Sequence, residues 1–381
     1  MTQKELISLL TKIIFLILFI FFIFIITINI YKFVEYVVKI DQILKLMEED
    51  NKELPLINTQ FNYLDINEGL YDPNIAYTAE KLGYRDRLKD INGSEWGEGI
   101  NILVIGSDKK DFHKEKSRAD VIIVLRIIKS GKILSLSIPR DSLITFSTGE
   151  YKGYTEKIGH SLFWGGLENL KHNIEIIMGS PIHKVIIVDN FRSFEAFLSI
   201  IGGIKVDKFL YGKLGIQWIR NRNFVYGDIE RCKRQQIFIK KAISKLWEIS
   251  KKGNYFYCIF AYRAFKRIFE TDLTEEEFIK IIYILKSNNF LPEENLYSSV
   301  LNGRFGKYNS ILSARNNLSC WILDEKEIEK IRLLFYSDSK NFSFYDRKIT
   351  FFDYLKNDIQ IILANKNTSN NKIKQSSIIN K

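Results

Sequence analysis

The stretch from Trp218 to Gln236 concentrates cationic side chains that could bind a phosphate group. Its cations are Arg220, Arg222, Arg231, Lys233 and Arg234, and its acids are only Asp228 and Glu230. Two or three guanidinium groups beside the free N–H groups of a helix N-terminus form a good clamp for phosphate or pyrophosphate. The alternative is a solvated basic face, which is the usual fate of a charged run.

The second half of this stretch predicts the start of a helix that extends to about Ser250. Gly227-Asp228 reads as a break followed by an N-cap residue, and apolar residues then recur at helical spacing. Arg231, Arg234 and Gln235 stand at positions i, i+3 and i+4 and therefore share one face of the first turns. Cations there oppose the helix dipole, and a bound anion would relieve that repulsion.

Two carboxylates, Asp108 and Asp120, stand at the edges of predicted strands. Mg²⁺ takes one or two protein carboxylates and fills its shell with substrate phosphate and water, so this pair is a candidate metal site. Two simpler alternatives remain open. Asp108 could form the turn after its strand, and Asp120 could pair with Arg118.

Arg140 follows Pro139 at the end of a third predicted strand, where its cation could face the same site or simply pair with Asp141. The sequence contains carboxylates and many arginines but no evident Ser-His or Cys-His unit. This inventory favours metal-assisted phosphoryl chemistry over acyl transfer.

The composition is that of a globular protein with an anionic partner. The chain has 381 residues, 46% hydrophobic residues and a formal net charge of +11. Its three cysteines and four histidines show no metal-binding or disulfide spacing, and Cys232 is expected to be a packed apolar residue.

Residues 13–31 carry no charge and consist almost wholly of Ile, Leu and Phe. We expect a transmembrane signal anchor, with a buried soluble helix as the alternative. The expected organisation is a cytoplasmic N-terminus at 1–12, the anchor at 13–31, a stalk and connector at 32–97, a catalytic domain at 98–336 and a C-terminal extension at 337–381, the end of which is expected to be disordered. The lysines flanking the span are nearly balanced and do not decide its orientation.

Alternating strand and helix signals predict an α/β fold with a mixed central β-sheet covered by helices. Strands are expected at 100–105, 121–128, 133–138, 184–188 and 204–206. Helices are expected at 191–200 and 274–286, in addition to the basic helix.

Six segments in order resemble the LytR-CpsA-Psr family: NILVIGSD, SRADVIIVLRI, LSLSIPRDSL, KIGHSLFWGG, IGGIKV and RNRNFVYGDIERCKRQQ. The resemblance runs from about Ile100 to Gln236 and more loosely to Gly303. It implies an α/β/α sandwich with an apolar tunnel, held outside the cell membrane by a single span. The implied activity is transfer of a glycopolymer from a polyprenyl-pyrophosphate carrier to peptidoglycan through a phosphodiester bond, with Mg²⁺ or Mn²⁺ as cofactor.

By motif position, Asp108 and Asp120 resemble the metal ligands of that family. The residues that resemble its pyrophosphate-binding set are Arg118, Arg140, Arg220, Arg222, Arg231, Arg234 and Gln235. Asp228 resembles the acid that orients the arginines and assists the acceptor hydroxyl.

The chain departs from the family pattern in three places. Lys109 replaces an arginine, GHSLFWGG replaces an Asn-Ala-Ala-Tyr pattern, and the segment between IGGIKV and RNR is shortened. Three other functions stay open: a lipid-pyrophosphate hydrolase, an inactive glycopolymer-binding member, and a membrane-bound regulator that binds nucleic acid through the basic helix. No helix-turn-helix is evident, so we expect no nucleic-acid partner.

Overall fold

The computed structural model describes residues 99–107, 116–188, 191–206, 209–220, 227–251 and 255–335. The predicted anchor at 13–31, the stalk and the tail after 336 lie outside these residues, as do Asp108 and Arg222. No helix in the described ranges is long and apolar enough to cross a membrane.

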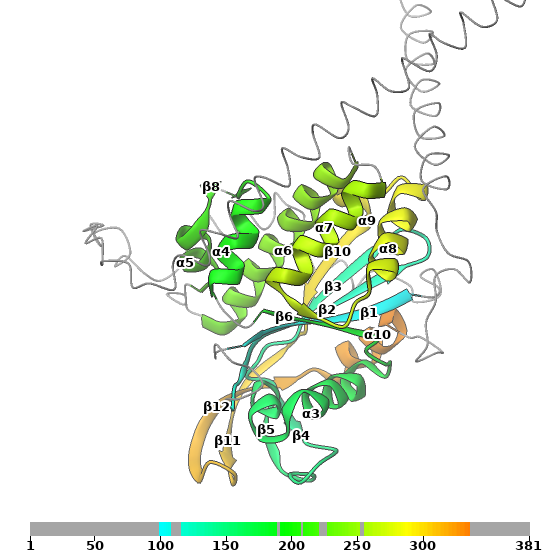
Figure 1. The fold of residues 1–381 in the computed structure, drawn as a ribbon. Coiled ribbons are helices and arrows are strands. Elements are labelled where there is room, and N and C mark those ends of the chain that lie inside the picture. Colours follow the sequence, from blue (N-terminus) through cyan, green and yellow to red (C-terminus); the bar gives the residue numbers. More distant parts are fainter. Residues whose placement is uncertain are drawn as a thin grey trace, which may run out of the picture. The chain divides into compact units, whose positions relative to one another are not determined.

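The described elements alternate between strands and helices (Figure 1). The strands are β1 (Gly99–Ser107), β2 (Ala119–Ile128), β3 (Ile133–Ser137), β4 (Leu143–Thr145), β5 (Thr155–Lys157), β6 (Lys184–Val188), β7 (Ile204–Lys205), β8 (Phe209–Leu210), β9 (Glu270–Thr271), β10 (Leu296–Val300), β11 (Gly303–Ser310) and β12 (Arg315–Leu323). The helices are the 3₁₀ turn η4 (Ile158–His160), α3 (Ser161–Met178), α4 (Phe191–Ile200), α5 (Gly212–Arg220), α6 (Gly227–Lys251), α7 (Tyr255–Ile268), α8 (Glu275–Ser287), α9 (Pro292–Asn295) and α10 (Glu325–Phe335).

The central sheet has six strands in the order β10-β3-β2-β1-β6-β9. β1 pairs antiparallel with β2 and parallel with β6, and β10 pairs parallel with β3, so the sheet is mixed. The predicted α/β fold with a mixed sheet is therefore confirmed, and the predicted strands and helices agree with the observed ones to within a few residues.

Helices cover both faces of this sheet (Figure 1). On β1, Leu103 and Ile105 join the core under α3 and α10, whereas Ile100 and Ile102 join the core under α6 and α8. This alternation follows from the two-residue period of a strand, which sends neighbouring side chains to opposite faces. Because both faces are covered, β1 reads as an almost continuous apolar run.

The start of α8 shows how local sequence specifies a helix end. The hydroxyl of Thr274 accepts a hydrogen bond from the N–H of Glu277, and the Glu277 carboxylate accepts one from the N–H of Thr274. This reciprocal capping box satisfies two N–H groups that the helix cannot satisfy itself.

The start of α6 differs from the prediction. The helix begins at Gly227, so Asp228 lies inside the first turn and is not the N-cap residue. Its carboxylate is engaged by Arg140 and Arg231, and this tertiary contact replaces the local capping role. The predicted apolar role of Cys232 is confirmed, because the side chain is buried; burial, reinforced by Asp228, raises the pKa of its thiol.

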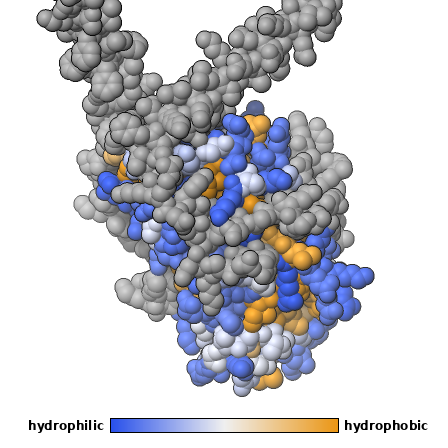
Figure 2. All heavy atoms as spheres, turned by 90° about the vertical axis from the view of Figure 1, so that its right-hand side faces the viewer, coloured by the Kyte–Doolittle hydropathy of each residue, from blue (hydrophilic) through white to orange (hydrophobic). Residues whose placement is uncertain are grey.

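Hydrophobic residues interrupt a largely hydrophilic surface on the side shown in Figure 2. Ile176 of α3 and Leu333 of α10 are among the large hydrophobic side chains that remain exposed. Isolated apolar side chains on a surface are ordinary, and they need no partner to explain them.

A buried carboxylate joins the β11–β12 hairpin to the rest of the domain. Glu156 of β5 is fully buried and accepts hydrogen bonds from the hydroxyls of Tyr308 and Ser310. His160 and the N–H of Lys157 also contact it, at 3.1 and 2.9 Å. Burial alone would raise the pKa of Glu156, but the bonds from His160, Ser310, Tyr308 and Lys157 lower it to about 2.

Replacing Glu156 with Gln should lower the free energy of unfolding at pH 7 by about 1–3 kcal/mol, because two buried hydroxyls lose a charged acceptor. Urea unfolding of the full chain in detergent micelles measures this difference. A carboxyl with a depressed pKa stabilises the fold above its unfolded pKa and loses that contribution as the pH falls through the folded pKa. The gap between wild type and variant should therefore shrink between the ordinary pKa of 4.5 and about 2.

Glu293→Gln, at an exposed position on α9, is the matched control and should leave the unfolding free energy within about 0.5 kcal/mol of wild type. A gap for Glu156→Gln that does not change with pH would show that the charge of Glu156 is not what stabilises the hairpin.

Candidate functional site

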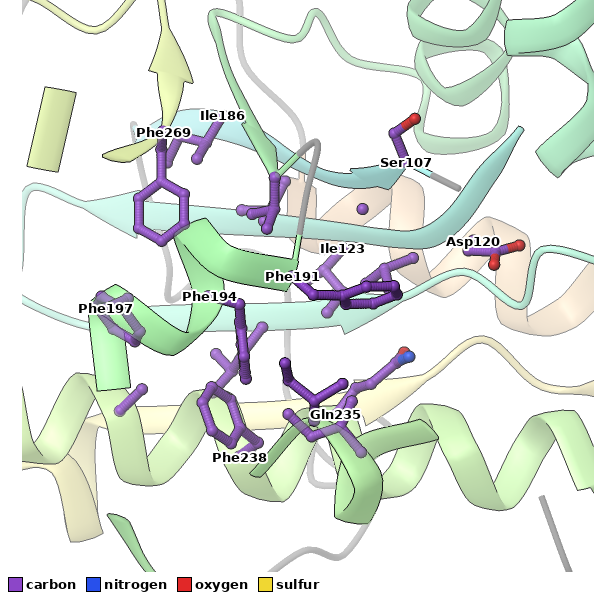
Figure 3. A pocket seen from close by; sticks show the side chains of 18 of the residues that line it. Ser107, Asp120, Ile123, Ile186, Phe191, Phe194, Phe197, Gln235, Phe238 and Phe269 are labelled. Atoms are coloured by element: carbon purple, nitrogen blue, oxygen red, sulfur yellow. The ribbon is translucent and has the colours of Figure 1, made fainter. Parts of the chain in front are cut away.

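A cavity of about 270 Å³ lies between one face of the central sheet and the helices α4, α5, α6 and α7 (Figure 3). Most of its walls are apolar. The hydrophobic residues that line it are Val104, Val121, Ile123, Leu125, Ile186, Val188, Phe191, Phe194, Phe197, Ile216, Ile219, Phe238, Ile239, Ala242, Ile243, Leu246, Phe265 and Phe269. Such a hollow suits a long apolar group, because each buried methylene contributes about 0.8 kcal/mol of transfer free energy.

The cavity has a polar end. Ser107 and Asp120 lie on the right of Figure 3, whereas Phe197 and Phe269 lie on the left. The remaining polar lining residues are Arg220, Arg231 and Gln235. An apolar chamber that ends in cations, an amide and a carboxylate can hold an amphiphile with an anionic head.

The pairing of β1 with β2 creates this end. Ser107 pairs with Ala119, and the register shifts between Gly106 and Ser107. The residue just before Asp108 is thereby placed beside the residue just before Asp120. Asp108 itself lies outside the described residues, so the predicted carboxylate pair stays a prediction.

Behind the polar end, two arginines and two aspartates form one ion-pair network. Arg140 contacts the carboxylates of Asp120 and Asp228, the latter at 3.5 Å from its Nε. Arg231 contacts Asp228 at 2.5 Å and also donates to the backbone carbonyl of Asp120 at 3.2 Å. The network joins the β2 end, the loop after β3 and the first turn of α6.

This arrangement decides between the alternatives for these residues. Asp120 contacts Arg140, which lies on a different segment of the chain, and Asp141 contacts Lys157 at 2.9 Å. Arg140 is thus not a surface partner of Asp141. Burial would lower the pKa of Arg140, but Asp120, Asp228 and Asp141 outweigh it, and the pKa is raised above its usual value. Arg140 is therefore a permanent cation.

A close backbone contact positions Arg140. The N–H of Gly159 in η4 donates to the carbonyl of Arg140 at 2.9 Å. A Cβ at Gly159 would lie 2.8 Å from the carbonyl oxygen of Ala119 and 3.0 Å from the Cβ of Arg140. Only glycine permits this approach between η4, β2 and the Arg140 loop.

The predicted cations of the basic stretch occupy different environments. Arg231 and Gln235 are buried and line the cavity, so the predicted helix face is not a solvated one. Arg234 is also buried, but its guanidinium donates to the carbonyl of Trp218 at 2.9 Å and does not line the cavity. Its contacts join α6 to α5.

Arg220 and Arg118 are the more exposed members of the predicted set. The guanidinium of Arg220 lies 4.5 Å from the ring centroid of Phe191, and both residues line the cavity. Arg118 is exposed just before β2 and does not line it. Arg222 lies outside the described residues.

The phenylalanines that form the apolar chamber were not among the predicted site residues. Phe191, Phe194 and Phe197 recur every three residues on α4, and all three point into the cavity beside Phe238. That spacing was visible in the sequence as one face of a predicted helix. What was not visible is that this face lines a hollow instead of filling a core.

The donor set fits a divalent cation only in part. In the described ranges, no group of three or more His, Cys, Asp and Glu side chains is arranged to hold a metal. Asp120 is the described carboxylate that lines the cavity. Because Mg²⁺ uses one or two carboxylates and takes its other ligands from phosphate and water, Asp120 fits an ion shared with a phosphorylated ligand.

The sequence matches a known family over part of its length. Residues 74–209 match the model of the LytR_cpsA_psr family. This match confirms, over that range, the resemblance drawn from the motifs. The matched range includes β1, β2, Arg140 and the phenylalanines of α4, and it ends before the basic helix α6.

The chain spans less than two thirds of the length of the curated relatives it matches. One is a polyisoprenyl-teichoic acid--peptidoglycan teichoic acid transferase TagU of Bacillus licheniformis, 29% identical over 204 residues, which are 48% of this chain and 64% of that protein. Another is the TagU of Bacillus mycoides, 31% identical over 127 residues, which are 32% of this chain and 40% of that protein.

Among solved structures, the crystal structure of B. subtilis TagV superposes with a TM-score of 0.53 at 22% sequence identity. It covers 63% of this chain and 98% of that chain. At this identity the likeness concerns the fold alone, and it agrees with the mixed α/β architecture described above.

Filling the chamber should prevent an apolar ligand from entering. Ala242→Phe places a ring where α6 lines the cavity, and we expect the affinity for a dansyl-labelled long-chain fatty acid to fall by about tenfold or more, equivalent to at least 1.4 kcal/mol. Energy transfer from tryptophan to dansyl in nanodiscs that carry the full chain measures the binding.

Ala261→Phe on α7, at a half-buried position outside the lining, is the matched control. Equal probe binding by both variants and the wild type would show that the cavity does not hold the apolar chain.

Proposed function

We propose that the chain is a phosphotransferase that moves a glycopolymer from a polyprenyl-pyrophosphate carrier to peptidoglycan, leaving a phosphodiester link. One observation carries the proposal: a cavity lined by phenylalanine and isoleucine ends at Asp120, Arg220, Arg231 and Gln235, with Arg140 directly behind. The surface that would bind an apolar chain therefore adjoins the groups that would bind an anion, as a lipid pyrophosphate requires. The TagU relatives are named as teichoic acid transferases, which is the same class of reaction.

In the proposed complex the polyprenyl chain occupies the apolar chamber and the two phosphates face the polar end. Arg231 lines that end. Its guanidinium can contact two phosphate oxygens at once.

The chemical step is an attack on phosphorus. A peptidoglycan sugar hydroxyl forms a new P–O bond with the sugar-proximal phosphorus, the P–O bond to the bridging oxygen breaks, and polyprenyl phosphate leaves with that electron pair. The hydroxyl proton passes to a carboxylate near the polar end, and the motif resemblance gives this role to Asp228. Arg140 and Arg231 balance the negative charge that develops on the leaving phosphate.

Asp228 has a positioning role in this proposal. Its carboxylate contacts both Arg140 and Arg231, so it holds the two guanidinium groups toward one place. A fixed array of cations accelerates such a reaction because it needs no reorganisation as charge develops.

The cofactor we propose is Mg²⁺ or Mn²⁺, held by Asp120 together with Asp108 and a substrate phosphate. When bound, such an ion would neutralise phosphate charge and stabilise the departing oxygen. The proposed location is the cell membrane, with residues 13–31 as a single-pass anchor and the catalytic domain outside the cytoplasm.

Arg140→Ala should lower the rate of transfer by about 100-fold or more, because removing one donor to a developing anion typically costs 10²–10³. The assay combines the full chain in nanodiscs with a lipid-linked pyrophosphoryl saccharide and a peptidoglycan oligomer, and mass spectrometry identifies the products. Arg231→Ala should behave likewise.

Lys233→Ala is the control on the same helix, since Lys233 pairs with Glu230 at 2.9 Å and does not line the cavity. Full transfer activity in the Arg140 and Arg231 variants would refute the assignment. Free glycan phosphate as the sole product, without glycan-linked muropeptide, would identify a hydrolase instead.

Removal of divalent ions by EDTA should abolish transfer, and Mg²⁺ or Mn²⁺ should restore it. In Asp120→Asn the concentration of Mg²⁺ needed for half-maximal rate should rise by about tenfold or more, because the ion loses a charged ligand. Glu230→Gln, outside the cavity, should not change the Mg²⁺ requirement. Activity that survives EDTA would exclude the metal.

A further inference from the structure

A cluster of aromatic side chains lies outside the cavity and is not used by the proposed reaction. We call Tyr151, Tyr154, Phe163 and Trp164 the aromatic platform. The ring centroids of Tyr151 and Trp164 are 5.2 Å apart, those of Phe163 and Trp164 are 4.9 Å apart, and Tyr151 and Tyr154 are 6.5 Å apart. The tyrosines come from the loop between β4 and β5, and the other two rings come from the first turn of α3.

The platform is partly open to solvent. Tyr154 is 38% exposed, and the other three rings are half-buried. The rings meet at tilted or edge-on angles of 56°, 65° and 81°, and therefore do not stack their faces on one another. Aromatic faces that are held at a surface but not used internally are available to a ligand.

Buried asparagines hold this loop against α3. The Ser147 hydroxyl donates to the Asn173 amide oxygen at 3.1 Å, and the Thr148 hydroxyl donates to that of Asn169 at 3.3 Å. The Asn173 amide N–H also donates to Asn169 at 3.1 Å. Both asparagines are nearly fully buried, so the rings are positioned before any ligand arrives.

Three glycines near the rings leave the space around them open. Gly149, Gly153 and Gly166 have φ values of 74°, 89° and 70°, and a Cβ at any of them would meet no atom within 4 Å. Their backbone turns favour glycine, and no neighbouring side chain covers the space above them. Gly166 marks a kink in α3 two residues after Trp164.

Lys116 and the turn η4 connect the platform, which lies at the start of α3, to the polar end of the cavity. The Nζ of Lys116 is 5.4 Å from the Phe163 ring centroid and 5.9 Å from that of Trp164. Lys116 stands four residues before Asp120, so their Cα atoms are at most about 14 Å apart. The turn η4, which precedes α3, packs on Arg140 through Gly159. A saccharide attached to a phosphate at Asp120 would need only a few sugar units to reach the rings.

We propose that the aromatic platform is a glycan subsite that stacks a pyranose ring of the sugar chain at the reaction centre. The polarised C–H bonds on one face of a pyranose suit the negative face of an aromatic ring, and its hydroxyls suit the tyrosine hydroxyls and the Lys116 ammonium. The half-buried rings and adjacent Glu150, Lys152 and Lys116 favour a polar, ring-shaped ligand over a lipid surface, which would require protruding apolar side chains. The placement of this glycan relative to the phosphates rests on the proposed function.

Binding of a soluble β-1,4-linked N-acetylglucosamine oligomer to the full chain in nanodiscs, followed by calorimetry, tests the platform without requiring turnover. Trp164→Ala should weaken binding by about tenfold or more, and Tyr151→Ala, which changes only a loop side chain, should weaken it as well. Phe305→Ala is the matched control, because Phe305 is an exposed ring of β11 outside the platform. Circular dichroism checks that each variant is folded.

In the transfer assay, the platform variants should raise KM and leave kcat within about twofold of wild type. The reason is that the platform would bind the glycan equally well in the ground state and in the transition state. A raised KM for the lipid-linked saccharide locates the donor glycan on the platform, and a raised KM for the peptidoglycan oligomer locates the acceptor there. Wild-type oligomer binding by folded Trp164→Ala and Tyr151→Ala would overturn the platform even if transfer occurs. Oligomer binding that depends on the platform in a chain without transfer activity would refute only the proposed reaction.

Discussion

The shared carboxylate of Asp228 is the interaction on which the site depends. It contacts Arg140 from the loop after β3 and Arg231 from its own helix, and Arg140 in turn contacts Asp120 on β2. Two cations next to one another in a half-buried place would repel, and the aspartates offset that repulsion. Breaking a buried ion pair typically costs about 3–5 kcal/mol. Removing Asp228 should therefore also displace the side chains of Arg140 and Arg231. The network joins elements that are far apart in the chain.

The cavity follows from how α4 and α6 meet the sheet. The phenylalanines of α4 and apolar residues of α6 line the space between these helices and the sheet, and α5 adds Ile216 and Ile219. The hollow lies next to the ion-pair network because Arg231 and Gln235 occupy the start of the same helix that supplies Phe238 and Ala242 farther along. One helix thus contributes to both the apolar and the polar part of the site.

The opposite side of the sheet supports this arrangement in a different way. α3 is reached through η4, whose Gly159 lies against Ala119 and Arg140. The same turn brings His160 to the buried Glu156, which joins the β11–β12 hairpin to β5. The backbone N–H of Trp321 in β12 also donates to the carbonyl of Asp141 at 2.8 Å. The loop that carries Arg140 is therefore restrained by η4 and by β12.

The sequence alone determined the local elements and the types of residue available for chemistry. Apolar periods located β1, β2, β3, β6, α4 and α8, because these signals depend on neighbours within a few residues. Tertiary structure decided which partners the charges acquire. Asp120 contacts Arg140, Asp228 engages arginines rather than capping its helix, and Arg231 faces the cavity while Arg234 faces Trp218. These outcomes depend on contacts between segments distant in the chain, and no local pattern of residues encodes such contacts.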